Sequence, residues 1–152
     1  MRQRITAALK DAMRGDDPTR TATLRLVLAA IKDREIENRT SSEEGSEISE
    51  GDVLQLLAKM IKQREESVKT YEEAGRVELA QREVAEIAVI SEFLPKPLDA
   101  SEAEVAMSEA IAEIGASSLK DMGSVMALLK QRYAGRMDFA AIGPMVKQRL
   151  GA

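Results

Sequence analysis

The sequence contains no cysteine, no histidine and no tryptophan, and it has only two tyrosines and two phenylalanines among its 152 residues. Without cysteine or histidine the chain cannot form a disulfide, a zinc site with sulfur or nitrogen ligands, a thiolate nucleophile or an imidazole base. So few aromatic side chains cannot form a stacking platform for single-stranded bases. These absences exclude most hydrolase mechanisms, and we expect no catalytic residue, no metal site and no cofactor.

Long apolar runs are missing as well. No segment approaches the roughly 18 consecutive apolar residues that predict a membrane-spanning helix, so we expect no membrane partner. Residues 1–13 include cations, but their apolar residues are spaced, so the apolar core of a secretory signal peptide is absent. We therefore expect the protein to stay in the cytoplasm.

The residues that are present favour helices. The chain is 44% hydrophobic and 32% charged, and a composition rich in Ala, Leu, Glu, Lys and Arg suits helices better than strands. Apolar residues recur at helical spacing along most of the chain, with no alternation typical of strands. The sequence predicts an all-α protein.

Local signals divide the first part of the chain into four helices. Asp16 or Asp17 can cap the second helix, with Pro18 in its first turn, and Ser49 followed by Asp52 predicts the start of the third. Residues 40–49 are polar, acidic and without periodicity, which predicts a flexible loop. Gly75 predicts the end of the third helix.

Two prolines within three residues, Pro95 and Pro97, end the fourth helix and predict a domain boundary. We expect a larger N-terminal helical domain over residues 1–94, a Pro-rich hinge over 95–98 and a small three-helix bundle over 99–152. In the last helix, Gly143 and Pro144 must either kink the helix or delay its start.

Charge is segregated within the second part of the chain. Residues 99–113 are acidic, whereas residues 117–152 have six cations and two anions, a net charge of +4 in a chain of net charge −4. A local basic face can attract phosphate within a Debye length of about 10 Å. The candidate phosphate contacts are Lys120, Lys130, Arg132, Arg136, Lys147 and Arg149.

Ser117 and Ser118 precede the first of these basic helices. Unpaired amide groups at a helix N-terminus attract anions, so these two serines are candidates for an anion site. A second interpretation stays open, because cations near helix C-termini, as Lys130 and Arg132 are, also complement the helix dipole on ordinary solvated faces.

Four segments resemble the YqeY-like family, which is similar to the C-terminal tail of the GatB subunit of the tRNA-dependent amidotransferase. They are "LRLVLAAIKDREIE" (24–37), "KMIKQREESVKTYEEAGRVELA" (59–80), "EIAVISEFLPKPL" (86–98) and "IGASSLKDMGSVMALLKQRYAGRMD" (114–138). The resemblance covers nearly the whole chain, and the motifs in this order are more specific than any one of them.

The resemblance implies an all-helical protein with a larger N-terminal and a smaller C-terminal helical domain. It also implies binding of tRNA, because the amidotransferase tail is implicated in holding tRNA while the reaction occurs in other domains. The family is associated with carbon–nitrogen ligase activity that uses glutamine as amide donor, and we take that label as inherited from the larger subunit.

Residue by residue, the "KDMG" motif of the family falls on Lys120–Gly123, and its "GR" falls on Gly135 and Arg136. The family often has a cation after "KDMG", where this chain has Ser124. No position here corresponds to a catalytic residue of the family.

Two functions from different classes follow. The first is a non-catalytic accessory protein that binds tRNA or another folded RNA, with an amidotransferase or another tRNA-handling enzyme as a candidate partner. The second is a protein-interaction adaptor that uses the helical N-terminal domain. The sequence does not indicate an oligomeric state.

Overall fold

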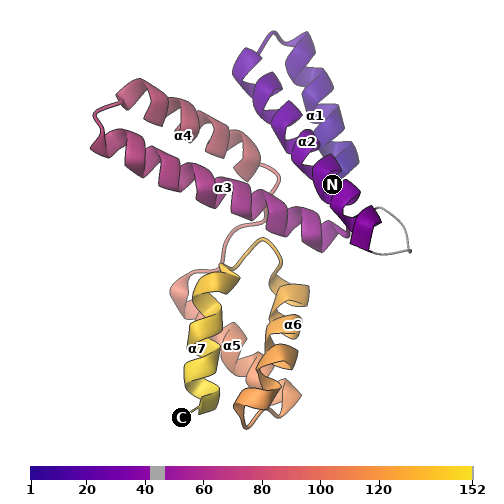
Figure 1. The fold of residues 1–152 in the computed structure, drawn as a ribbon, viewed down its shortest axis with the longest axis vertical. Coiled ribbons are helices and arrows are strands. Elements are labelled where there is room, and N and C mark those ends of the chain that lie inside the picture. Colours follow the sequence, from indigo (N-terminus) through magenta and orange to yellow (C-terminus); the bar gives the residue numbers. More distant parts are fainter. Residues whose placement is uncertain (42–46, 152) are drawn as a thin grey trace. The chain divides into compact units, whose positions relative to one another are not determined.

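The computed structural model describes residues 1–41 and 47–151, and it describes the side chains of 1–39 and 47–151. The chain divides into two compact units, Met1–Leu94 and Pro95–Ala152 (Figure 1). Every regular element in the described residues is helical, so the predicted all-α class is confirmed.

The first unit contains four helices: α1 (Arg2–Arg14), α2 (Pro18–Ser41), α3 (Glu50–Glu73) and α4 (Val77–Ser91). The caps are local and follow the sequence: the Asp17 carboxylate accepts a hydrogen bond from the amide of Arg20, and the Ser49 hydroxyl accepts one from the amide of Asp52. Gly75 follows α3 with a φ of 72°, a left-handed conformation that glycine adopts without strain.

The loop expected over residues 40–49 is shorter in the structure, because α2 runs to Ser41 and α3 begins at Glu50. Residues 47–49 are not helical, and residues 42–46 lie outside the described part of the chain.

Figure 1 shows α1 pairing with α2 and α3 pairing with α4 as two helical hairpins, and α2 also packs against α4. Their apolar faces form one core. Its most deeply buried members are Ile5, Leu24, Val27, Ile31, Leu57 and Ile90.

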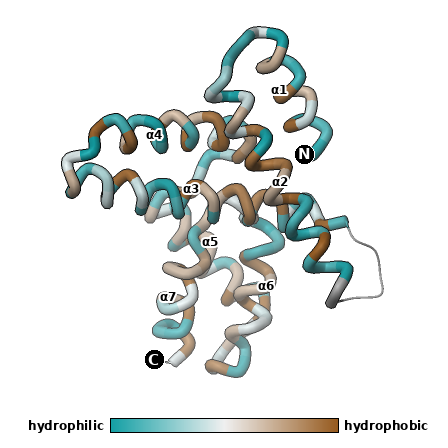
Figure 2. The backbone as a smooth tube through the Cα atoms, turned by 45° about the horizontal axis from the view of Figure 1, so that its top comes forward, coloured by the Kyte–Doolittle hydropathy of each residue, from teal (hydrophilic) through white to brown (hydrophobic). Residues whose placement is uncertain are grey.

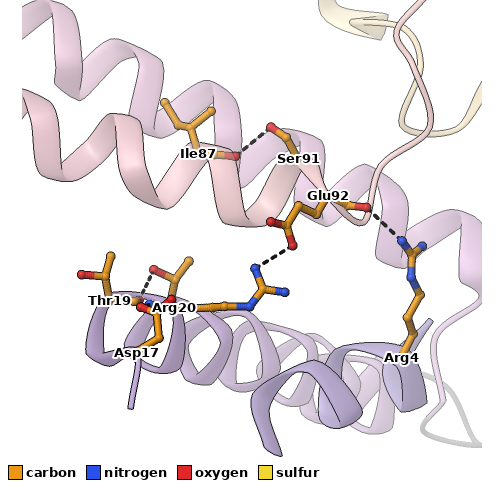
Figure 3. Close-up of polar contacts among 8 residues, drawn as sticks. Arg4, Asp17, Thr19, Arg20, Ile87, Ser91 and Glu92 are labelled. Carbon is orange, nitrogen blue, oxygen red and sulfur yellow. Dashed lines mark hydrogen bonds and ion pairs between the residues drawn. The ribbon is translucent and has the colours of Figure 1, made fainter. Parts of the chain in front are cut away.

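Polar contacts at the end of α4 join three of these helices (Figure 3). The Arg20 guanidinium lies 2.6 Å from the Glu92 carboxylate, and Arg4 donates a hydrogen bond of 2.9 Å to the Glu92 carbonyl. Arg4 also lies over the Phe93 ring, with 5.2 Å between the guanidinium carbon and the ring centroid. These contacts fix the segment that leads to the proline-rich boundary.

The second unit contains α5 (Ala100–Ile114), a short 3₁₀ turn η1 (Leu119–Asp121), α6 (Met122–Tyr133) and α7 (Phe139–Gly151). Asp99 and Glu102 form the predicted capping box at the start of α5. The helix ends at Gly115, whose φ of 70° is again left-handed. The sequence therefore marks both ends of α5 correctly.

The helix α7 begins at Phe139 and continues through Gly143 and Pro144. Of the two predicted alternatives, the delayed start is wrong. Proline in this position removes one backbone hydrogen bond from the helix. The apolar face of α7 packs into the core of the second unit through Ile142, Val146 and Leu150.

Hydrophobic and hydrophilic positions are interspersed along every helix, and none is hydrophobic throughout (Figure 2). Among the described residues, no helix combines the length and the apolar character that crossing a bilayer would need.

Candidate nucleic-acid interface

Three of the six candidate phosphate contacts are exposed lysines. Lys120 lies in η1, Lys130 in the last turn of α6 and Lys147 in α7. Within the described part of the chain none of them has a hydrogen-bond or ion-pair partner. Their ammonium groups are therefore available to a ligand.

Lys120 and Lys147 belong to two elements that pack against each other, η1 and α7. Gly151 packs close to Leu119, the neighbour of Lys120, and Gly143 packs close to Met122. Residues four positions apart share one face of a helix, so Lys147 belongs to the face of α7 that carries both glycines. Each of these two packed elements therefore carries one exposed lysine.

Two candidate arginines are already paired with acidic residues of α5. The Arg132 guanidinium lies 2.6 Å from the Glu113 carboxylate, and that of Arg149 lies 2.6 Å from the Glu104 carboxylate. Arg149 also donates a hydrogen bond of 2.7 Å to the Ser108 hydroxyl. Both carboxylates are more than half exposed, at 53% and 66%, so these are surface ion pairs of low net energy.

Arg136 takes part in the structure of its own unit. It donates a hydrogen bond of 2.9 Å to the Lys96 carbonyl, and its guanidinium carbon lies 6.0 Å from the centroid of the Tyr133 ring. The Arg136 carbonyl in turn accepts a hydrogen bond of 2.9 Å from the amide of Leu98. These contacts hold the start of the unit against the end of α6.

The amide groups of Ser117 and Ser118 are occupied by a carboxylate of the protein itself. Both donate to the same oxygen of Asp121, at 3.0 and 3.2 Å. An external anion at this turn would have to displace Asp121. Ser118 is the N-cap of η1. The sequence suggested that the amides of both serines are unpaired, and in the structure both are paired.

The pairing of α5 with the basic helices was not predictable from any local motif. Glu104 and Glu113 are 45 and 19 residues from their arginine partners, so no local motif connects them. The one available signal was the segregation of acids into residues 99–113, because an acidic helix packed beside basic helices pairs with some of their charges.

Another cluster of charges lies between α3 and α4 of the first unit. Arg64 donates to the Glu86 carboxylate at 2.9 Å and to the Met60 carbonyl at 3.2 Å. Partial burial of Glu83, together with the nearby Glu86, raises the pKa of the Glu83 carboxyl above its ordinary value of 4.5, and Arg64 opposes this shift.

No group of three or more carboxylates in the described residues could hold a metal ion.

The second unit offers exposed lysines for electrostatic contact with an anionic partner. Contacts of this kind bind and position a ligand.

Comparison with known proteins identifies a family. The model of the family described as Yqey-like protein matches residues 2–150. The protein named Altered inheritance of mitochondria protein 41, mitochondrial, from Lachancea thermotolerans is 35% identical over 97 residues, which are 64% of this chain and 49% of the relative. Its namesake from Meyerozyma guilliermondii is 37% identical over 97 residues, 64% of this chain and 48% of the relative.

An uncharacterized protein from Schizosaccharomyces pombe is 30% identical over 92 residues, 60% of this chain and 70% of the relative. The chain thus spans about half the length of the mitochondrial relatives that it matches.

The expectation of a cytoplasmic protein is wrong, because the names of these relatives place them in mitochondria. The prediction rested on a missing apolar core, which excludes a secretory signal only, whereas mitochondrial targeting segments are amphipathic and rich in arginine.

Proposed function

The chain belongs to the YqeY-like family, and from this premise we propose that it is an accessory protein without a reaction of its own that binds tRNA or another folded RNA through its second unit. The resemblance of the family to the tail of a tRNA-dependent amidotransferase supports this proposal. An amidotransferase or another tRNA-handling enzyme would then act on the bound RNA.

The observation that carries the proposal is the set of unpaired lysines, Lys120, Lys130 and Lys147, on η1, α6 and α7. Glu104 and Glu113 of α5 are paired with arginines, so these two acids do not neutralise the lysines directly. With so few aromatic side chains, recognition would rely on backbone phosphates and on the shape of a folded RNA.

The test is the binding of fluorescently labelled bulk tRNA, measured by anisotropy over a series of salt concentrations. Replacing Lys120, Lys130 and Lys147 by glutamine should weaken binding and reduce the slope of log affinity against log salt by about 3, because each phosphate-bound lysine contributes about 1.

The matched control replaces three exposed lysines of the first unit, Lys10, Lys32 and Lys69, by glutamine. This variant has the same net charge as the first, so equal losses in both would mean that binding follows net charge and that the second unit has no site. Absence of tRNA binding at low salt in the unaltered protein would also refute the proposal.

In the latter case, the interaction adaptor is the next candidate function. It is favoured by Leu26 and Ile36 of α2, which are both 49% exposed although they are large and apolar. The two side chains are about 15 Å apart along the helix, so they offer two separate apolar contacts along α2. An interaction with another helix would cover these two side chains.

A further inference from the structure

A groove of about 390 Å³ runs along α5 and the end of α6 in the second unit. Its apolar surface comes from Leu98, Val105, Ala106 and Tyr133. We propose that this groove docks a basic amphipathic helix of a partner protein, with an apolar side chain against Val105 and a Lys or Arg beside Glu109.

The exposure of Val105 is the first argument. Its side chain is 54% exposed, although Ala106 beside it is 4% exposed and belongs to the core of the unit. A half-exposed valine that lines a groove offers apolar area whose burial by a partner is favourable, by about 25 cal/mol per Å².

The charges around the groove specify the partner. Glu102 and Glu109 lie along the same groove, and Glu109 has no hydrogen-bond or ion-pair partner in the described part of the chain. An apolar partner would bury this carboxylate without compensation, and an acidic partner would repel it. A Lys or Arg of the partner, next to its apolar side chain, would pair with the Glu109 carboxylate.

Arg136 is the cation among the described residues that line the groove, and it does not pair with Glu109. Arg136 donates to the Lys96 carbonyl and lies over the Tyr133 ring, and no ion pair joins it to Glu102 or Glu109 among the described residues. Arg136 therefore forms a wall of the groove and leaves Glu109 to the partner.

The shape favours a helix over a small molecule. Pockets that take drug-sized ligands enclose 70–90% of the ligand, whereas Glu102, Val105 and Glu109 here are all exposed. Positions 102, 105 and 109 follow helical spacing, so they lie along one side of α5, and Leu98 lines the groove from the segment before the helix. A second helix beside this row is the familiar arrangement of an amphipathic helix in a groove.

The experiment uses the full chain and two labelled synthetic helical peptides. The first has leucines at helical spacing with lysines beside them, and the second has glutamate in place of every lysine. We expect the lysine peptide to bind and the glutamate peptide not to bind. The NMR chemical shifts that change should belong to α5 and to residues 133–136.

The variant Val105→Gln/Glu109→Gln should weaken binding of the lysine peptide about tenfold, as expected when an anchor residue is lost. Both positions are exposed on a helix, and circular dichroism will show whether the variant is folded. The matched control, Val84→Gln/Glu78→Gln, changes an exposed valine and an exposed glutamate of α4 and should bind as the unaltered protein does.

Equal weakening in both variants would overturn the proposal, because the peptide would then follow the net acidity of the chain. Failure of the lysine peptide to bind would overturn it as well. If bulk tRNA instead changed the shifts of the same α5 residues, the groove would be part of an RNA surface and the proposal would be wrong. The proposal does not depend on the lysines of the RNA test, so the two can fail separately.

Discussion

Glu83 of α4 shares its surroundings with Glu86 and Arg64, and its carboxyl pKa is raised, chiefly by partial burial and then by the charge of Glu86. A carboxyl with a raised pKa keeps its proton in the folded protein at a pH where the unfolded chain has lost it. Its contribution to stability therefore falls as the pH rises from its ordinary pKa of 4.5 through the raised value.

Replacing Glu83 by glutamine removes the stability loss that Glu83 causes as the pH rises. Relative to the unaltered protein, the variant Glu83→Gln should gain unfolding free energy as the pH rises above 4.5, and it should be the more stable of the two at neutral pH. The measurement is urea unfolding at several pH values in a chain with Tyr133→Phe, so that the fluorescence comes from Tyr71 of the same unit.

The control for this prediction is Glu78→Gln, since Glu78 is an exposed acid in the first turn of α4. There a negative charge stabilises the helix through its dipole, so this variant should lose about 0.3–1 kcal/mol at neutral pH. A loss of stability in both variants would contradict the assigned role of Glu83.

At the scale of the helix, carboxylates of α5 pair with one arginine of α6 and one arginine of α7. Glu104 and Glu113 pair with Arg149 and Arg132, and exposed ion pairs of this kind contribute about 0–1 kcal/mol, so they can exchange partners. If the second unit binds RNA as proposed, the two carboxylates compete with phosphate for the arginines.

The variant Glu104→Gln/Glu113→Gln should therefore bind bulk tRNA more tightly, with a salt slope steeper by up to about 2 if both arginines reach phosphates. Glu109→Gln serves as the control for each single change, because it removes one negative charge from the same helix and releases no arginine. An equal gain from Glu109→Gln and Glu104→Gln would show that net charge alone is responsible.

The helices also show what the sequence could predict. The helix caps, such as Ser49 and Asp99, were predictable because each uses residues no more than three positions apart. Pro144 left two alternatives, and only packing of Ile142 and Val146 into the core decided for a continuous helix. For the candidate site, the sequence indicated the basic residues as a local excess of charge, and their contact with phosphate stays a prediction. It could not indicate which cations are paired, because Glu104 and Arg149 meet only in the tertiary fold.

At the scale of the whole molecule, the division at Leu94 predicts that the two units unfold separately. The chain offers a direct test, since it has no tryptophan and its two tyrosines lie in different units, Tyr71 in the first and Tyr133 in the second. Replacing either tyrosine by phenylalanine leaves a fluorescence signal from one unit only.

The second unit should unfold at the lower urea concentration and with the smaller dependence on urea. It is the shorter unit, a shorter chain buries a smaller fraction of its surface, and the urea dependence scales with the surface exposed on unfolding. In addition, Pro144 has no amide hydrogen, so α7 lacks one of its backbone hydrogen bonds. Coincident transitions of Tyr71 and Tyr133 would contradict this prediction and would mean that the chain unfolds as one cooperative unit.

A change at one helix cap makes the test stricter. Asp99→Ala removes the capping box of α5 and should cost the second unit about 1 kcal/mol. If the units unfold independently, the Tyr133 transition moves to lower urea while the Tyr71 transition stays in place. A shift of both transitions would show that the stability of the second unit is coupled to that of the first. The RNA and peptide experiments would then require stability controls on both units.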